Sequence, residues 1–70
     1  MDTPQNDITL TDQEKRILSL VTEGKRYKDI AAALDLSEQT IKWYGMRLRA
    51  KFNASTSSEL IHKVTEKGLL

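Results

Sequence analysis

The sequence has no cysteine, a single proline, a single histidine and few aromatic residues. Without cysteine the chain can form neither a disulfide framework nor a thiolate zinc site, which fits a cytoplasmic protein. No apolar run approaches the roughly 18 residues that a membrane span needs, so no membrane partner is expected. One histidine, no thiol and no paired carboxylates on an inward face predict neither an enzyme nor a bound metal or cofactor.

The length of 70 residues corresponds to one small domain with a modest core. The first segment, Met1–Ile8, is polar and acidic and resembles neither a signal peptide nor a transit peptide. We therefore expect a flexible lead-in over residues 1–9 and a single domain over residues 10–70.

The net charge is only +1, but the charges are unevenly distributed. Between Lys25 and Lys51 there are seven basic and three acidic side chains, which gives this segment a net charge of +4. The rest of the chain has a net charge of −3. This polarised middle is compatible with a local anionic partner and equally with a solvated charged surface.

The apolar residues follow a helical period, and no segment alternates as a strand does, so the predicted fold class is all-α. Four helices are expected, the first opening at Thr11 and the others spanning about 27–34, 38–52 and 57–67. Their inward stripes are predicted to contain Ile17, Leu18, Val21, Ile30, Ala31, Leu34, Leu60, Ile61 and Val64, with Leu69 and Leu70 folding back onto the core.

Capping signals mark the ends of these helices. Thr11–Glu14 and Thr56–Glu59 both have the capping-box pattern, in which the hydroxyl and the carboxylate each accept a free backbone N–H group. Gly24 and Gly68 follow the first and fourth helices, where a left-handed residue ends a helix.

A very short connection, Asp35–Leu36, separates the second helix from the third, which Ser37 caps. This spacing is typical of a helix-turn-helix motif. At 100° per residue, one face of the third helix collects Ile41, Tyr44, Gly45, Leu48 and Phe52. The opposite face collects Gln39, Lys42, Trp43, Met46, Arg49 and Ala50, with Arg47 and Lys51 on the flank. Because no acid follows Glu38, this helix is suited to a polyanionic groove.

The order of short motifs resembles that of a known family. The motifs are Leu10-Thr-Asp-Gln-Glu14, Ile17-Leu18, Glu23-Gly-Lys, Asp29-Ile-Ala31, Leu34-Asp-Leu-Ser37, Thr40-Ile-Lys42, Lys51-Phe52 and Gly68-Leu-Leu70. Together they resemble the LuxR-type (LuxR/GerE/NarL) DNA-binding domain of bacterial transcription regulators. The resemblance implies a four-helix fold with a central helix-turn-helix, a third helix that enters the major groove and a fourth helix that forms a homodimer contact.

The expected DNA-binding residues lie at the start of the second helix, in the first turn of the third helix and along its outer face. Matching by position implies that Thr40 and Lys51 touch phosphates and that Lys42, Trp43 and Met46 face the groove. Lys42 and Arg49 share a face and can each reach a guanine edge or a phosphate. The complete predicted set is Lys25, Arg26, Tyr27, Lys28, Gln39, Thr40, Lys42, Trp43, Met46, Arg47, Arg49 and Lys51, in which the first four form a phosphate-binding cluster at the start of the second helix.

The middle of the third helix departs from the usual pattern, because Gly45 stands where relatives commonly have a branched aliphatic residue. A glycine here costs roughly 1 kcal/mol relative to alanine and leaves a gap that Tyr44, Trp43 or Phe52 is expected to fill in part. Trp43 has three open interpretations: contact with a thymine methyl or sugar, folding over that gap, or contact with a protein. Met46 either meets a thymine methyl or has no role.

Four polar residues of the fourth helix are expected at a weak homodimer contact: Glu59, His62, Lys63 and Glu66. The predicted function is that of a sequence-specific DNA-binding transcription regulator, or of its DNA-binding domain, with double-stranded DNA as the partner. The alternative is a protein-interaction module that binds or sequesters another regulator, and RNA polymerase is a further candidate partner. A sigma-factor fourth region is disfavoured by the capped fourth helix and Gly68-Leu-Leu70.

Overall fold

Side-chain caps mark the starts of the first, third and fourth of the described helices. The computed structural model describes residues 9–68, in which α1 spans Asp12–Thr22. The Thr11 hydroxyl accepts the Glu14 N–H at 3.1 Å, and Glu14 Oε1 accepts the Thr11 N–H at 2.9 Å. The predicted capping box is therefore confirmed. Gly24 follows α1 with a φ of +85°, which is a conformation that favours glycine.

The remaining helices are α2 (Tyr27–Leu34), α3 (Glu38–Lys51) and α4 (Ser57–Lys67). At α4 the expected capping box is only half formed. The Thr56 hydroxyl accepts the Glu59 N–H at 3.1 Å, but Glu59 Oε1 accepts the N–H of Ser55 at 2.7 Å. The carboxylate thus binds one residue before the cap, because the Ser55 N–H also needs an acceptor.

Left-handed residues also end the other three helices. Asp35 closes α2 with a φ of 58°, Asn53 follows α3 with a φ of 56°, and Gly68 closes α4 with a φ of 66°. Aspartate and asparagine tolerate this conformation better than other non-glycine residues. The sharp reversal at Asp35 brings α3 back across α2, which produces the tight turn of the helix-turn-helix.

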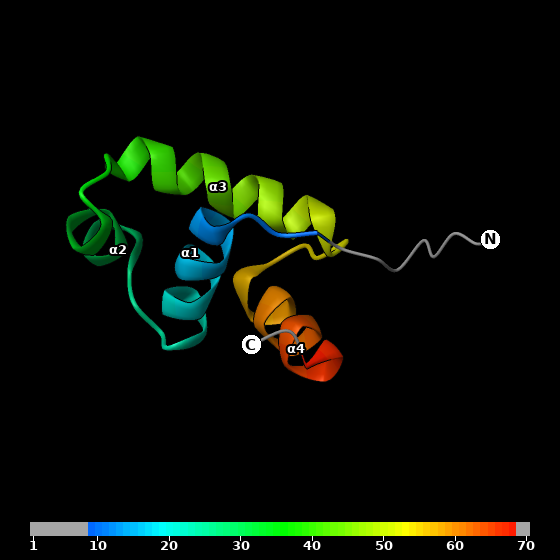
Figure 1. Ribbon diagram of the computed structural model, residues 1–70. Helices are drawn as coiled ribbons and strands as arrows, with labels where there is room; N and C mark the ends of the chain where they lie inside the picture. The colour runs from blue at the N-terminus through cyan, green and yellow to red at the C-terminus, as the bar shows by residue number, and fades with distance from the viewer. Residues whose placement is uncertain (1–8, 69–70) are drawn as a thin grey trace.

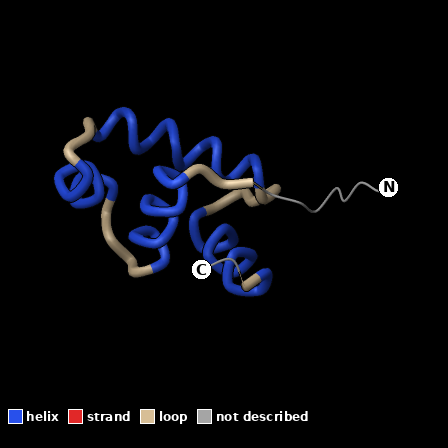
Figure 2. Tube along the Cα trace, in the orientation of Figure 1, coloured by secondary structure: helices blue, strands red, loops and turns tan. Residues whose placement is uncertain are grey.

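The helices surround one hydrophobic core, which contains Ile17, Leu18, Val21, Ile30, Ala31, Ile41, Leu48, Phe52, Leu60 and Val64. All of these lie where the helical period predicted an inward face, whereas Leu34 and Ile61 are only half-buried. Burying each large apolar side chain contributes about 1.5–3 kcal/mol. Figure 1 shows α3 crossing above α2 and α1, and α4 lying below the last turn of α3. Helices and loops make up the whole described trace in Figure 2.

Two expectations concern residues outside the described range: the lead-in before Thr9, and the folding back of Leu69 and Leu70. Leu10 is described and packs against the core. Between residues 9 and 68, none of the helices is both long enough and apolar enough to cross a membrane.

Candidate nucleic-acid interface

The two faces of α3 differ as the helical wheel predicts. Ile41, Gly45 and Leu48 are buried against the other helices. Trp43 and Met46 are the exposed large hydrophobic residues of the described chain, at 50% and 62% exposure. Exposed basic and polar side chains surround them, namely Gln39, Lys42 and Arg47. The outer face of α3 is therefore basic with an apolar centre.

Trp43 lies on the surface and not over the core. Its ring meets the Tyr44 ring edge-on, with 5.0 Å between centroids and an interplanar angle of 76°. The guanidinium carbon of Arg47 lies 4.8 Å from the centroid of the Trp43 ring, which is within the range of a cation–π interaction. The interpretation that Trp43 folds over Gly45 as a core residue is thus wrong, because neighbouring side chains hold the indole at the surface.

Tyr27, from the first turn of α2, occupies the space beside Gly45. A Cβ at Gly45 would overlap the Tyr27 hydroxyl and would lie 3.0 Å from Tyr27 Cζ and 3.4 Å from Arg49 Nη1. The space beside this glycine is accordingly taken by Tyr27 and Arg49, neither of which the sequence suggested for it. Tyr27 begins the preceding helix, so no spacing within α3 could have indicated it.

Arg49 also differs from the simple wheel picture. Its side chain is half-buried, and Nη1 donates a hydrogen bond of 3.0 Å to the Tyr27 hydroxyl. The sequence placed Arg49 beside Lys42 on an open surface, but the structure places its guanidinium between α3 and the start of α2. Its expected contact with DNA stays a prediction.

Three cations surround the first turn of α2, and all are exposed: Lys25, Arg26 and Lys28. Arg26 is the N-cap residue, and its side chain does not cap the helix. The first N–H groups of α2 are therefore left without a side-chain acceptor, which is an arrangement that suits an anion. Tyr27 completes the predicted phosphate-binding cluster, but it is half-buried and packs against the core.

The first turn of α3 is braced internally. Ser37 Oγ accepts the Thr40 N–H at 3.1 Å and lies 2.9 Å from the Thr40 hydroxyl oxygen. Thr40 is half-buried, whereas Gln39 is exposed. These bonds fix the turn, and the DNA contacts expected of both residues stay predictions.

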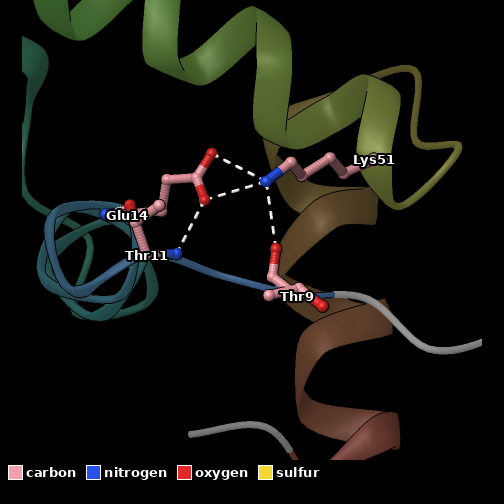
Figure 3. A network of polar contacts seen from close by, with 4 residues as sticks. All are labelled: Thr9, Thr11, Glu14 and Lys51. Carbon is pink, nitrogen blue, oxygen red and sulfur yellow. Dashed lines mark hydrogen bonds and ion pairs between the residues drawn. The ribbon is translucent and has the colours of Figure 1, made fainter.

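Lys51 joins the end of α3 to α1 (Figure 3). Its Nζ donates to both carboxylate oxygens of Glu14, at 2.8 and 2.9 Å, and to the carbonyl oxygen of Thr9 at 3.1 Å. The Glu14 side chain is 2% exposed and that of Lys51 is 28% exposed. Burial raises the pKa of the Glu14 carboxyl, but the hydrogen bonds from Lys51 and Thr11 and the charges of Lys51 and Arg47 together leave this pKa below its ordinary value. The sequence did not reveal this pair.

The residues expected at a dimer contact form two pairs along α4. His62 Nε2 lies 3.6 Å from Glu66 Oε2, and both side chains are largely exposed. Lys63 Nζ lies 3.5 Å from Glu59 Oε2 and donates to the Asn53 carbonyl oxygen at 2.8 Å. The N–H of Ser55 lowers the pKa of the Glu59 carboxyl. His62 and Glu66 therefore present a polar surface, and the dimer contact stays a prediction.

Comparison with known proteins agrees with this geometry. The family model of "Bacterial regulatory proteins, luxR family" matches residues 8–64. DesR of Bacillus subtilis, a transcriptional regulatory protein, is 37% identical over 84% of the chain and 30% of its own length. DevR/DosR of Mycobacterium tuberculosis, a DNA-binding transcriptional activator, is 40% identical over 81% of the chain and 26% of its own length.

Solved structures give the same result. VqmA of Vibrio cholerae superposes with a TM-score of 0.88 and 30% identity, covering 96% of this chain and 30% of VqmA. A phage VqmA superposes with a TM-score of 0.84 and 37% identity, covering 89% of this chain and 28% of that protein. The chain thus spans less than a third of each of these longer proteins. By fold and by sequence, the chain belongs to the LuxR family of bacterial regulatory proteins and has the helix-turn-helix DNA-binding domain of its transcription regulators.

Proposed function

We propose that α3 enters the major groove of double-stranded DNA and makes the chain a sequence-specific DNA-binding module. The observation that carries this proposal is the outer face of α3. It exposes Lys42 and Arg47 around Trp43 and Met46, and no acid follows Glu38 in the helix. Cations at a helix surface attract the phosphate backbone, and apolar side chains between them can meet thymine methyl groups.

Phosphate contacts on either side of the groove are assigned to two helix starts. Lys25, Arg26 and Lys28 are exposed at the first turn of α2, which is the helix that crosses the backbone in this motif. At the start of α3 the Thr40 N–H is bound by Ser37 Oγ, so the phosphate contacts proposed for Gln39 and Thr40 are made by their side chains. Lys51 is the weakest of the proposed phosphate ligands, because its ammonium group already donates to Glu14 and Thr9.

A second part of the proposal concerns assembly. VqmA of Vibrio cholerae is described as a dimer in the absence of its target DNA, and the exposed polar pair His62–Glu66 lies on α4 of this chain. We place a weak homodimer contact along that helix, at Glu59, His62, Lys63 and Glu66. Two copies related by a two-fold axis would then read half-sites about one helical turn apart.

The groove assignment is tested by the salt dependence of binding. The probe is a random-sequence duplex of about two helical turns, and affinity is measured by fluorescence anisotropy at several salt concentrations. We expect a steep loss of affinity with salt, because each neutralised phosphate releases counterions. The double variant K28A/K42A should lower the slope of log K against log salt by about two.

The matched control is K15A/K67A, which removes two exposed lysines from α1 and α4. Its slope should equal that of the unmodified chain. Equal slopes for both double variants would show that the basic face of α3 and the start of α2 do not bind DNA.

The second candidate is a protein-interaction module, which the exposure of Trp43 and Met46 favours. Its partner would be another regulator or RNA polymerase. NMR titrations with the duplex and then with a purified regulator separate the two functions. Shifts at Trp43 only on addition of protein would favour this candidate, whereas shifts along the whole outer face of α3 on addition of DNA would favour the first.

A further inference from the structure

One contact crosses from α2 to α3 and involves Tyr27, Gly45 and Arg49. Arg49 Nη1 donates to the Tyr27 hydroxyl at 3.0 Å. Both groups lie against the bare Cα of Gly45, where a Cβ would overlap the phenol oxygen. Gly45 is buried, so the glycine leaves space that these two side chains fill.

The glycine determines where the Arg49 guanidinium lies. Side chains of a helix lean toward its N-terminus and cover the preceding turn, which for Arg49 is the turn of Gly45. With a bare Cα there, the guanidinium can lie low across the helix and meet Tyr27. A larger residue at position 45 would displace the Tyr27 hydroxyl and would leave Arg49 without its partner.

This contact places the Arg49 charge at the junction of the two helices of the motif. Tyr27 is the first residue of α2, and the exposed cations Lys25, Arg26 and Lys28 lie around the same turn. A guanidinium has five N–H donors, and only one of them is used by Tyr27. Among residues 9–68 the other donors of this guanidinium make no hydrogen bond, so they can bind an anion that lies across the start of α2.

We propose that Tyr27 is a positioning residue that holds Arg49 for contact with a backbone phosphate of DNA, and that Gly45 is present to permit this. The inference rests on the proposed function, because it requires that α2 and α3 face DNA. A phosphate is favoured over a base edge because Tyr27 pulls the guanidinium toward α2, the helix that crosses the backbone.

The test is a double-mutant cycle between the two side chains. Y27F, R49Q and Y27F/R49Q are compared with the unmodified chain on the same random-sequence duplex. R49Q should lower the salt slope by about one, the value for one lost phosphate contact. Y27F removes only the hydroxyl and should weaken binding about three- to tenfold, the value of one hydrogen bond. In the R49Q background Y27F should have no further effect.

The matched control is Y44F, which removes a hydroxyl from the other tyrosine, half-buried on α3. Its affinity should be unchanged. G45A gives an independent check, because alanine is the better helix former and any loss cannot come from a weaker helix. G45A should weaken binding as much as Y27F does, and the two effects should not add.

Two failures are distinguishable. If the unmodified chain binds the duplex with a steep salt slope but the effects of Y27F and R49Q are additive, Tyr27 does not position Arg49 and only this inference is overturned. If R49Q changes affinity for some sequences and not others, Arg49 reads a base and the phosphate assignment is wrong. If the unmodified chain shows no binding at low salt, the proposed function itself fails.

A measurement on the free protein tests whether Tyr27 positions Arg49 independently of DNA binding. The Arg49 Nη1–H resonance in the free protein should be protected from exchange with water by the bond to Tyr27. Y27F and G45A should both increase its exchange rate, whereas Y44F should not. Equal exchange in all four proteins would overturn the positioning role.

Discussion

The ammonium group of Lys51, in the last turn of α3, lies 2.8 Å and 2.9 Å from the two carboxylate oxygens of Glu14 in α1. These residues are 37 positions apart, and the carboxylate is almost completely buried. Because Glu14 also closes the capping box of α1, one side chain supports both the start of a helix and the packing of another.

Lys51→Met should destabilise the domain by about 2–3 kcal/mol. The substitution keeps most of the aliphatic packing but leaves the buried Glu14 carboxylate without its cation. Lys15→Met removes an exposed lysine from α1 and serves as the control, with a change of about 0.5 kcal/mol or less. Urea unfolding followed by circular dichroism measures both, and equal midpoints would refute the prediction.

Acid should unfold the domain in a Glu14-dependent way. The pKa of the Glu14 carboxyl is lower in the folded protein than its ordinary value of 4.5, so the unfolded chain binds the proton more readily. The stabilisation is therefore complete above about pH 4.5 and is lost as the pH falls through the folded pKa. We expect the unfolding temperature of the unmodified chain to drop across this window.

The Glu14→Gln variant should have a lower unfolding temperature than the unmodified chain near neutral pH. Below that pH, its unfolding temperature should depend less steeply on pH. Thermal unfolding between pH 7 and pH 3 measures the two curves. Parallel curves for E14Q and the unmodified chain would exclude Glu14 as the source of the acid sensitivity.

Trp43 should respond to the methyl group of thymine. Once a bound sequence has been selected from random duplexes, each thymine in the groove facing α3 is replaced by uracil, which lacks only that methyl. Loss of one buried methyl should weaken binding about fourfold at the position facing Trp43. W43A should bind more weakly and should not distinguish thymine from uracil at that position. M46A should likewise not distinguish thymine from uracil at the position that faces Met46.

The absence of cysteine from the sequence permits a direct test of the α4 contact. In a two-fold interface, residues near the axis face their own copies. His62→Cys should therefore form a cross-linked dimer on mild oxidation, provided that the two Cα atoms approach within about 7 Å. Ala33→Cys, at an exposed site on α2, is the control. Cross-linking of A33C at the same rate would indicate random collision.

Local signals predicted most of the fold. The Thr11–Glu14 capping box and the range of α2 could be read from neighbours in the chain and agree with the structure. The pattern also predicted the left-handed glycines Gly24 and Gly68 that follow α1 and α4. These features depend on residues within about one helical turn of each other, where spacing alone decides which groups can meet.

Contacts between helices were not predicted. Nothing near Glu14 indicates that Lys51 will bind it, and nothing near Gly45 indicates that Tyr27 fills its space. Both depend on how α3 crosses α1 and α2, and helical periodicity gives the face of a helix but not its crossing partner. The second capping box failed for a local reason, because Ser55 competes for the Glu59 carboxylate.

The occupied space above Gly45 has a consequence for sequence variation in this domain. A branched aliphatic residue at position 45 would meet the Tyr27 phenol and displace it, which would also remove the hydrogen bond from Arg49. An engineered change at position 45 of this chain must therefore treat positions 27 and 45 as a pair.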